Sequence, residues 1–266
     1  MDENEILATE IRGSVGTLIL NRPAKKNALS PDLLAQLHVV LTHWAEENHI
    51  RTVIITGGTG KMFSAGYDIQ AIPSGTTPEM DRVLKGENPL QLALGTLRHF
   101  PYPTIAMMNG DAFGAGLHLC MCCDIRIAAD DIKVAMPPAR LGVIYPPEGL
   151  RHFISVIGMA TTREVFLTAR TYEGRELLEK RLVDYLIPRS ELSTATYNLA
   201  GDIAERAPLS LRGTKRILEM LEDSLLLSDD CKQTADKLLA EAFNSEDARE
   251  AKRAFTEKRK PRFTGR

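Results

Sequence analysis

The sequence predicts an α/β fold with a largely parallel sheet, followed by a helical C-terminal region. Three observations predict it. Apolar, β-branched runs alternate with stretches of helical periodicity up to about residue 160, glycine-bearing turns follow two of those runs, and amphipathic helical stretches dominate beyond that point. Because no linker rich in Gly, Ser or Pro divides the chain, we expect a core in residues 1–200 and a helical region in residues 201–266 that fold as one unit.

The N-terminal half supplies most of the strands. Gly13-Ser14 lies between two β-rich runs and predicts an opening hairpin. Ser30-Pro31 supplies an N-cap followed by a proline at the first helical position, which predicts a helix that continues to about Glu47. The expected strands are 6–11, 15–20, 52–57, 103–108 and 124–129, and the later ones alternate with helices at 90–100 and from about residue 116.

The C-terminal half is predicted to be mainly helical. Apolar residues recur there at helical spacing, and the short run 183–187 is the last expected strand. The expected helices are 162–167, 172–179, 191–206, 209–221 and 231–243.

The composition is that of an ordinary globular protein. Apolar residues make up 44% of the 266 residues and charged residues 26%, with a formal net charge of -2. That charge gives no electrostatic basis for nucleic acid binding, and the longest uncharged stretches are shorter than the roughly 18 residues that span a bilayer. The acidic start, Met1-Asp2-Glu3, lacks the pattern of a secretory signal. We therefore expect a cytoplasmic protein that binds neither nucleic acid nor membrane.

Three of the four cysteines, Cys120, Cys122 and Cys123, lie close together in one expected helix. With His118 they suggest a metal site, but helical neighbours one and two positions apart point in different directions and do not converge on one ion. We therefore expect these cysteines to be buried packing residues, and we expect no bound metal.

Two glycine-bearing turns are the most informative feature of the sequence. Residues 63–69 read Phe-Ser-Ala-Gly-Tyr-Asp-Ile and residues 109–116 read Asn-Gly-Asp-Ala-Phe-Gly-Ala-Gly, each after an expected strand. In an α/β sheet such turns lie beyond the carboxyl ends of the strands, where ligands bind. Two matching turns predict a pair of backbone N–H groups directed at one oxygen, an oxyanion hole that stabilises charge developing on a carbonyl.

Six motifs in a fixed order give the chain a family resemblance. Besides the two glycine turns, they are Asn-Arg-Pro-Ala-Lys-Lys-Asn-Ala-Leu at 21–29, Cys-Asp-Ile-Arg-Ile-Ala at 123–128, Leu-Gly-Val at 141–143 and Phe-Thr-Glu-Lys-Arg-Lys-Pro-Arg-Phe at 255–263. With them the sequence resembles the crotonase, or enoyl-CoA hydratase/isomerase, superfamily. The resemblance implies a spiral core of ββα units, a coenzyme A thioester as substrate without a further cofactor, and a homotrimer or hexamer assembled through the helical region.

The resemblance also implies where the substrate binds. The backbone N–H groups of Tyr67 and Ala115 would hold the thioester oxygen. The coenzyme would lie near the 21–29 motif and the first glycine turn, and two residues of the tail would reach it from the adjacent subunit. The residues implied are Lys25, Lys26, Ala65, Asp68, Ile69, Phe255 and Lys258. The lysines suit the coenzyme's phosphates as point charges, although solvated lysines beside a turn have the same pattern.

Two departures from the family pattern bear on the reaction. Hydratases of this family place one glutamate four residues after Gly114 and a second just before the following Leu-Gly. Here those positions hold His118 and Pro138. Water addition uses paired carboxylates as acid and base, which a proline and a lone histidine do not replace. We therefore expect inefficient hydration.

Within the superfamily the pattern is most similar to the methylmalonyl-CoA decarboxylases of bacteria. Tyr145, in Leu-Gly-Val-Ile-Tyr, matches a tyrosine that holds the substrate carboxylate there. Loss of carbon dioxide from a malonyl-type thioester requires an oxyanion hole and an apolar site but no general base. Tyr67 stands where these enzymes usually carry histidine, and Glu148 stands where they carry an apolar residue.

These positions leave several interpretations open. Glu148 could be the base of an enoyl-CoA isomerase or a solvated acid in the first turn of a helix. Tyr145 could hold a carboxylate or be a packed aromatic, and His118 could donate a proton or be a satisfied core histidine. Decarboxylation is the leading hypothesis, and isomerisation, hydration and acyl-CoA binding without catalysis are the alternatives. The candidate catalytic residues are Tyr67, Ala115, Tyr145, Glu148 and His118.

Overall fold

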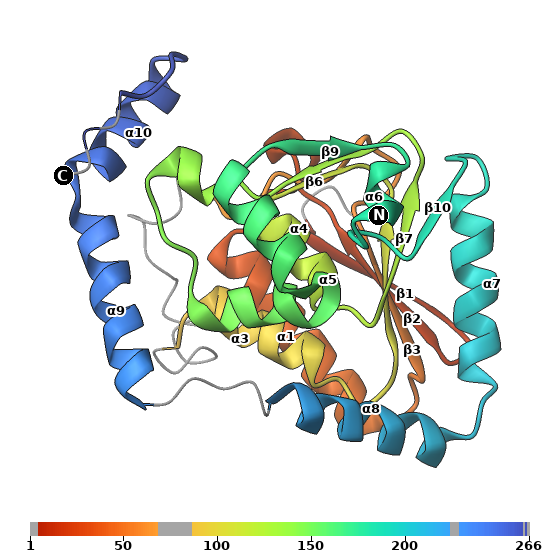
Figure 1. Ribbon diagram of the computed structural model, residues 1–266. Helices are drawn as coiled ribbons and strands as arrows, with labels where there is room; N and C mark the ends of the chain where they lie inside the picture. The colour runs from red at the N-terminus through yellow and green to blue at the C-terminus, as the bar shows by residue number, and fades with distance from the viewer. Residues whose placement is uncertain (1–4, 69–86, 224–228, 263, 265–266) are drawn as a thin grey trace.

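The computed structural model describes residues 5–68, 87–223, 229–262 and 264 of the chain. It contains a six-stranded sheet and a four-stranded sheet with helices around them (Figure 1). Helix α7 packs on the larger sheet, and α1, α3, α4 and α5 gather on the opposite side of that sheet in Figure 1. The predicted α/β fold is thereby confirmed.

The larger sheet begins with the predicted antiparallel hairpin and continues as a parallel sheet. Its two central strands, β3 and β5, are buried along their whole length, which is typical of a parallel sheet covered on both faces. In spatial order the strands are β1 (Leu7–Arg12), β2 (Val15–Leu20), β3 (Thr52–Thr56), β5 (Thr104–Met108), β7 (Ile125–Ala129) and β10 (Tyr185–Ile187).

The smaller sheet positions the two glycine turns. Its strands are three residues each, and β4 and β6 pair in parallel, so the turns that follow them emerge at one edge. The sequence predicts that the glycine turns follow the expected strands 52–57 and 103–108, which are β3 and β5. In the structure a further short strand, β4 or β6, lies between each of these strands and its turn. In spatial order the strands are β4 (Met62–Ser64), β6 (Asp111–Phe113), β8 (Lys133–Ala135) and β9 (Thr171–Glu173).

The first helix begins as its sequence predicts. The Ser30 hydroxyl accepts a hydrogen bond from the Leu33 amide, and Pro31 occupies the first helical position. The helices of the core are α1 (Pro31–Glu47), α3 (Pro89–Arg98), α4 (Ala115–Met121), α5 (Pro147–Thr168), α6 (Glu176–Glu179) and α7 (Leu192–Ala204), with 3-10 turns η1 (Pro23–Lys25) and η3 (Pro138–Leu141).

Two sequence predictions of helices need correction. The helix expected over 172–179 is wrong in its first part, because Tyr172 lies in β9 opposite Val134 and Gly174 takes a positive φ of 61°. The helix expected at 162–167 is the end of a longer one, α5, which has already begun at Pro147 and is interrupted by non-helical Gly158.

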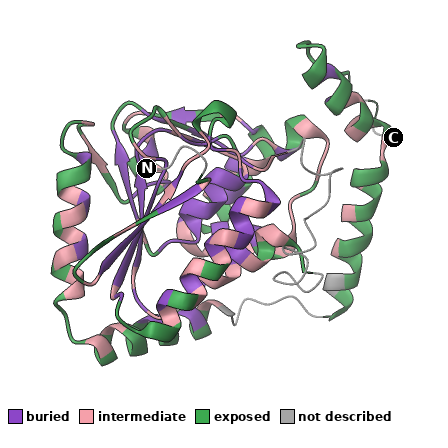
Figure 2. Cartoon of the chain, turned by 180° about the vertical axis from the view of Figure 1, so that it is seen from behind, coloured by how far each residue is buried: buried purple, intermediate pink, exposed green. Residues whose placement is uncertain are grey.

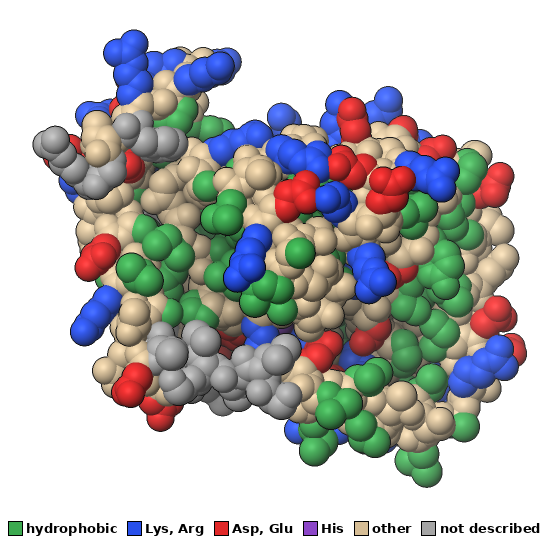
Figure 3. Space-filling model, in the orientation of Figure 1, with side chains coloured by type: hydrophobic (Ala, Val, Ile, Leu, Met, Phe, Trp, Pro, Cys, Tyr) green, Lys and Arg blue, Asp and Glu red, His purple; other side chains and the backbone are tan. Residues whose placement is uncertain are grey.

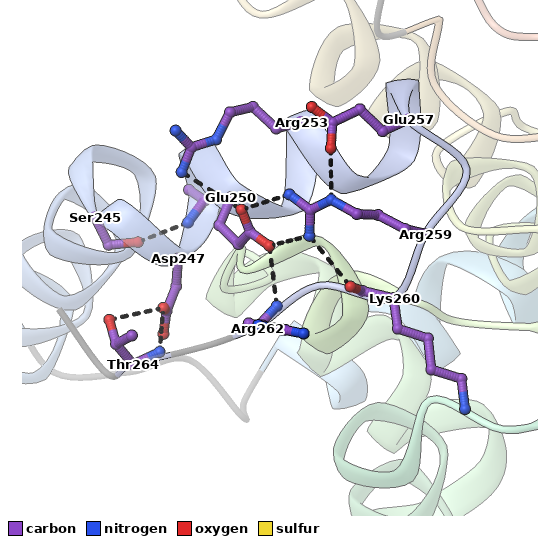
Figure 4. Close-up of polar contacts among 10 residues, drawn as sticks. Ser245, Asp247, Glu250, Arg253, Glu257, Arg259, Lys260, Arg262 and Thr264 are labelled. Carbon is purple, nitrogen blue, oxygen red and sulfur yellow. Dashed lines mark hydrogen bonds and ion pairs between the residues drawn. The ribbon is translucent and has the colours of Figure 1, made fainter.

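Three helices form the C-terminal region: α8 (Pro208–Asp223), α9 (Asp229–Asn244) and α10 (Glu246–Thr256). They run along the outside of the core, and most of their described surface is exposed (Figure 2). The segment after α10 folds back on it, because Arg259 donates to the Glu250 carboxylate at 2.5 and 3.0 Å and the Arg262 amide donates to it at 3.0 Å (Figure 4). The Arg259 hydrogen bonds hold the pKa of Glu250 down at about 2. That 201–266 forms a separate oligomerisation region stays a prediction.

The core is built from aliphatic, aromatic and sulfur-containing side chains of the sheets and the surrounding helices. Cys120, Cys122 and Cys123 are buried within it, as predicted, and carry free thiols. Among the described residues, no helix has the length and the apolar character needed to cross a membrane.

Candidate active site

The two predicted glycine turns meet in the structure. Gly66 has a φ of 100° and Gly114 a φ of 53°, conformations that L side chains rarely adopt. A Cβ atom at Gly66 would lie 2.8 Å from the Phe113 oxygen and 3.5 Å from the Ala115 nitrogen. Glycine is therefore required at Gly66 both for its backbone conformation and for the close approach of the second turn.

Hydrogen bonds fix the first turn. The Leu29 amide donates to Gly66 O at 2.8 Å and the Asp68 amide donates to Leu29 O at 3.0 Å. The Ser64 hydroxyl accepts from the Gly66 amide at 3.2 Å and donates to Asn27 O at 2.8 Å. These contacts hold Tyr67, between Gly66 and Asp68, in one backbone orientation.

The amides of Tyr67 and Ala115 are suited to receive a ligand oxygen. Within the described residues, the structure records no protein acceptor for either of them. Ala115 is the first residue of α4, so its N–H lies at the positive end of that helix. The geometry can hold an oxyanion between two N–H donors.

Tyr145 and His118, which the sequence proposed separately, form one hydrogen-bonded pair. The Tyr145 hydroxyl lies 2.7 Å from His118 Nδ1, and the two rings meet edge to face with centroids 5.4 Å apart. His118 is three residues beyond Ala115 on α4 and therefore on the same side of that helix. The pair is an uncharged one, because burial lowers the pKa of His118 to about 3 and raises that of Tyr145.

His152 of α5 extends this pair into the core. Its Nδ1 lies 3.0 Å from His118 Nε2 and 3.5 Å from the Cys122 sulfur. Burial, with the neighbouring His118 as a smaller cause, lowers the pKa of His152 to about 2, and burial raises the pKa of Cys122. The three side chains therefore form a neutral chain of polar contacts behind Tyr145.

The position of Glu148 is compatible with both interpretations that the sequence left open, a solvated acid in the first turn of a helix and a base at the site. It lies in the first turn of α5, where a carboxylate interacts favourably with the helix dipole, and it is exposed. It also lines a cavity of about 60 Å³ together with His118, Tyr145 and His152. Pro138, at the position of the second hydratase glutamate, is buried at the start of η3.

The structure brings together most of the residues expected to contact the coenzyme. Lys25 and Lys26 are exposed on and beside η1, and Lys26 O accepts a hydrogen bond from the Ala65 amide at 3.0 Å. Asp68 forms an ion pair of 3.0 Å with Arg22, so its carboxylate is engaged within the chain. Ile69 lies outside the described residues.

The two tail residues lie elsewhere in the chain. Phe255, which is 72% exposed, is on α10, and Lys258 follows that helix with a positive φ of 53°. Among the described residues, no hydrogen bond or ion pair joins either of them to the first glycine turn. A contribution of both residues to a neighbouring subunit's site stays a prediction.

Sequence reasoning missed His152 and the contact of Cys122 with it. The available signal was weak: Glu148, Gly149 and His152 are spaced for one face of a helix, and His118 and Cys122 are four residues apart in another. Such spacing shows that residues share a face, but it does not show which two faces pack together.

Comparisons with known proteins agree on one family. The enoyl-CoA hydratase/isomerase family model matches residues 10–266. A probable enoyl-CoA hydratase of Bacillus subtilis (strain 168) is 36% identical over 253 residues, which cover 94% of this chain and 95% of that protein. Methylmalonyl-CoA decarboxylase of Escherichia coli (strain K12) is 30% identical over 252 residues, which cover 94% of this chain and 95% of that protein.

A solved structure extends the likeness to the fold. Methylmalonyl-CoA decarboxylase in complex with 2-nitronate-propionyl-CoA superposes with a TM-score of 0.89 at 28% identity, covering 98% of this chain and 99% of that one. The chain belongs to the enoyl-CoA hydratase/isomerase family, the crotonase superfamily, and is an acyl-CoA-processing enzyme. Because the names of the relatives include both a hydratase and a decarboxylase, the reaction has to be argued from the site.

Proposed function

We propose that this enzyme decarboxylates methylmalonyl-CoA or a similar malonyl-type thioester. One observation carries the proposal: the two positions that hold glutamates in hydratases are occupied by a neutral histidine bonded to Tyr145 and by a buried proline. Neither of them can activate water as a carboxylate does. The similarity to methylmalonyl-CoA decarboxylase of Escherichia coli supports the same reaction.

The proposed mechanism uses the oxyanion hole as its main catalytic element. The Tyr67 and Ala115 amides hold the thioester oxygen, and Tyr145 orients the carboxylate through its hydroxyl. The bond between Cα and the carboxylate carbon breaks, carbon dioxide leaves, and the electron pair forms the enolate whose negative charge lies on the thioester oxygen. Cα then takes up one proton from water or from the Tyr145 hydroxyl, which solvent then reprotonates. Two fixed N–H donors stabilise the charge at the moment it develops, and no base is needed.

The rest of the substrate is proposed to bind across the first turn and a neighbouring subunit. The phosphates of the coenzyme would lie near Lys25 and Lys26, which are exposed and free of a recorded ion pair within the described residues, and the adenine near Ala65 and Asp68. Phe255 and Lys258 would reach the coenzyme of an adjacent subunit in a homotrimer or hexamer. The exposed apolar side chains of α8 support such an assembly, and Figure 3 shows apolar side chains at that edge of the molecule.

Isomerisation of an enoyl-CoA is the second candidate, because Glu148 lines the same cavity as His118 and Tyr145. In that reaction Glu148 would move a proton between two carbons of the acyl chain. The structure favours decarboxylation because Glu148 is exposed, whereas a base in this family would be expected to face a water-poor pocket.

A mass-spectrometric screen of the purified protein tests the proposal. The substrates are methylmalonyl-, malonyl-, crotonyl- and 3-enoyl-CoA, and each reaction has its own signature: loss of carbon dioxide, gain of water, or a shifted double bond. We expect loss of carbon dioxide from methylmalonyl-CoA. Rapid gain of water on crotonyl-CoA would contradict the proposal. Binding of all four thioesters without turnover would also contradict it and would indicate an acyl-CoA-binding protein without catalytic activity.

A further inference from the structure

A chain of four polar side chains leads from the candidate site into the core. It runs from the Tyr145 hydroxyl to His118 Nδ1 (2.7 Å), from His118 Nε2 to His152 Nδ1 (3.0 Å), and from there to the Cys122 sulfur (3.5 Å). His152 is 3% exposed, and its other nitrogen, Nε2, has no hydrogen-bond partner among the described residues. Nothing in the proposed reaction explains why the core holds this second histidine.

A metal ion is the first alternative to consider. One potential ligand atom each from His118, Cys122 and His152 lies within 4.8 Å of the others. The ring geometry argues against an ion, because the facing nitrogens are 3.0 Å apart while the ring centroids are 5.2 Å apart. The distance between the centroids exceeds the distance between the nitrogens by close to two ring radii. Both nitrogens therefore lie almost on the line that joins the centroids. The rings therefore point at each other, as in a hydrogen bond, whereas ligands of one metal converge on it at an angle.

The contact with Cys122 decides which histidine donates. Each neutral histidine has one N–H and one bare nitrogen. If His152 Nδ1 were the acceptor, the His118 N–H and the Cys122 S–H would compete for a single lone pair, and an N–H would remain on the partnerless, buried Nε2. If His152 Nδ1 carries the proton, one N–H is shared between two acceptors, a common arrangement, and the partnerless atom is a bare nitrogen. Buried N–H groups without an acceptor are the rarer case in proteins.

We propose that His152 is a positioning residue that fixes the tautomer of His118 by donating its Nδ1–H to His118 Nε2. His118 then carries its own proton on Nδ1 and donates it to the Tyr145 oxygen. The Tyr145 hydroxyl proton is left free to point toward the substrate. In the opposite tautomer Tyr145 would donate to His118 and would have no proton to offer a carboxylate. This consequence rests on the proposed function, in which Tyr145 meets the substrate carboxylate.

The packing of α5 keeps this arrangement in place. A Cβ atom at Gly149 would lie 2.4 Å from Tyr145 Cε1 and 3.1 Å from His118 Cε1. Gly149 therefore allows α5 to pack closely on the Tyr145 and His118 rings. His152, three residues further along the same helix, contacts the other side of His118. Helix α5 thus contacts the Tyr145 and His118 pair at two points.

The test combines nitrogen NMR of the imidazole rings with two matched variants. In the wild-type protein, ¹⁵N shifts and couplings should show His118 protonated on Nδ1. His152→Leu removes the donor that fixes the tautomer, so we expect the Nε2-protonated form of His118, absent from the wild type, to become populated. We expect kcat for methylmalonyl-CoA to fall at least about twofold with it, with little change in KM. His152→Asn places an amide N–H near the position of Nδ1 and should restore both the tautomer and most of kcat.

Several results would overturn the assignment. One is a wild-type His118 that is protonated on Nε2. Another is a folded His152→Leu protein with the wild-type tautomer and kcat. A third is stoichiometric zinc in the purified wild-type protein that is absent from His152→Leu. If His152→Leu does not fold, His152→Gln serves instead, because its amide reaches the position of Nε2 rather than Nδ1 and should fail to rescue. The tautomer is read without turnover, so an Nδ1-protonated His118 in a protein inactive on methylmalonyl-CoA would support the assignment and overturn only the proposed reaction.

Discussion

At the scale of residues, burial keeps three side chains of the candidate site, His118, His152 and Tyr145, uncharged. His118 and His152 are both enclosed, with pKa values lowered to about 3 and about 2, and burial raises the pKa of Tyr145. At neutral pH these groups can donate and accept hydrogen bonds, but none of them is ionised. Such a site can orient a carboxylate and leave it poorly solvated, which favours its loss as carbon dioxide.

Two substitutions separate the candidate reactions. Tyr145→Phe removes the hydroxyl that contacts His118 and should lower kcat for decarboxylation about 10²-fold or more, because the carboxylate loses its positioning group. Glu148→Gln should leave decarboxylation within a few-fold of the wild type. Steady-state kinetics on methylmalonyl-CoA and on a 3-enoyl-CoA measure both effects. The opposite pattern, with Glu148→Gln inactive and Tyr145→Phe active, would assign isomerisation.

The buried histidines should make the fold sensitive to mild acid. Above about pH 6.5, both are neutral in the folded and the unfolded chain and add no pH dependence. Below that pH the unfolded chain binds a proton at each histidine, whereas the folded chain does not do so until the pH reaches about 3 for His118 and about 2 for His152. The free energy of unfolding should therefore fall as the pH falls below about 6.5, by up to about 1.4 kcal/mol per pH unit and histidine.

Urea unfolding at pH 7, 6 and 5 measures this effect. His152→Asn, which cannot titrate in this range, is the matched control and should show a smaller loss of stability between pH 7 and pH 5. Identical pH slopes for the two proteins would show that His152 is accessible to protons in the folded state.

At the scale of elements, the start of α4 supplies one donor of the proposed oxyanion hole. Ala115 is its first residue, a position where proline is well tolerated, and Pro89 and Pro147 already begin α3 and α5. Ala115→Pro should remove one donor of the proposed oxyanion hole and lower kcat/KM about 10²- to 10³-fold with little change in Tm. Ala115→Gly keeps the N–H and should remain active. Equal activity of the proline variant would show that this amide is not a donor.

The elements also show what the sequence could predict. Local signals identified α1, whose capping Ser30 and Pro31 act within one turn, and both glycine turns, whose positive φ values only glycine adopts easily. The three-residue strands β4 and β6 are too short for a period of two to be visible. Their pairing depends on residues distant in the sequence, as does the contact of His152 with His118.

At the scale of the whole molecule, the C-terminal region exposes apolar side chains that a second chain would cover. On α8, Leu209 is 83%, Ile217 60% and Met220 58% exposed. Large apolar groups gathered on one exposed helix are typical of a protein interface. They support the proposed trimer or hexamer.

Light scattering should therefore show three or six chains per particle. Ile217→Glu places a charge in the proposed interface and should yield smaller particles, since an unpaired carboxylate is costly to bury. Ser190→Glu adds the same charge at an exposed position outside α8 and serves as the control. A monomeric wild-type protein would contradict the assembly and, with it, the contribution of Phe255 and Lys258 from a neighbouring subunit.

The central claim is that this member of the family stabilises an enolate without activating water. The most direct measurement is kcat/KM for decarboxylation of methylmalonyl-CoA and for hydration of crotonyl-CoA, determined side by side on one preparation of the enzyme. With His118 and Pro138 in place of the hydratase glutamates, we predict that decarboxylation exceeds hydration by at least about 10²-fold, the contribution of one general acid or base. Hydration that equals or exceeds decarboxylation would contradict the account.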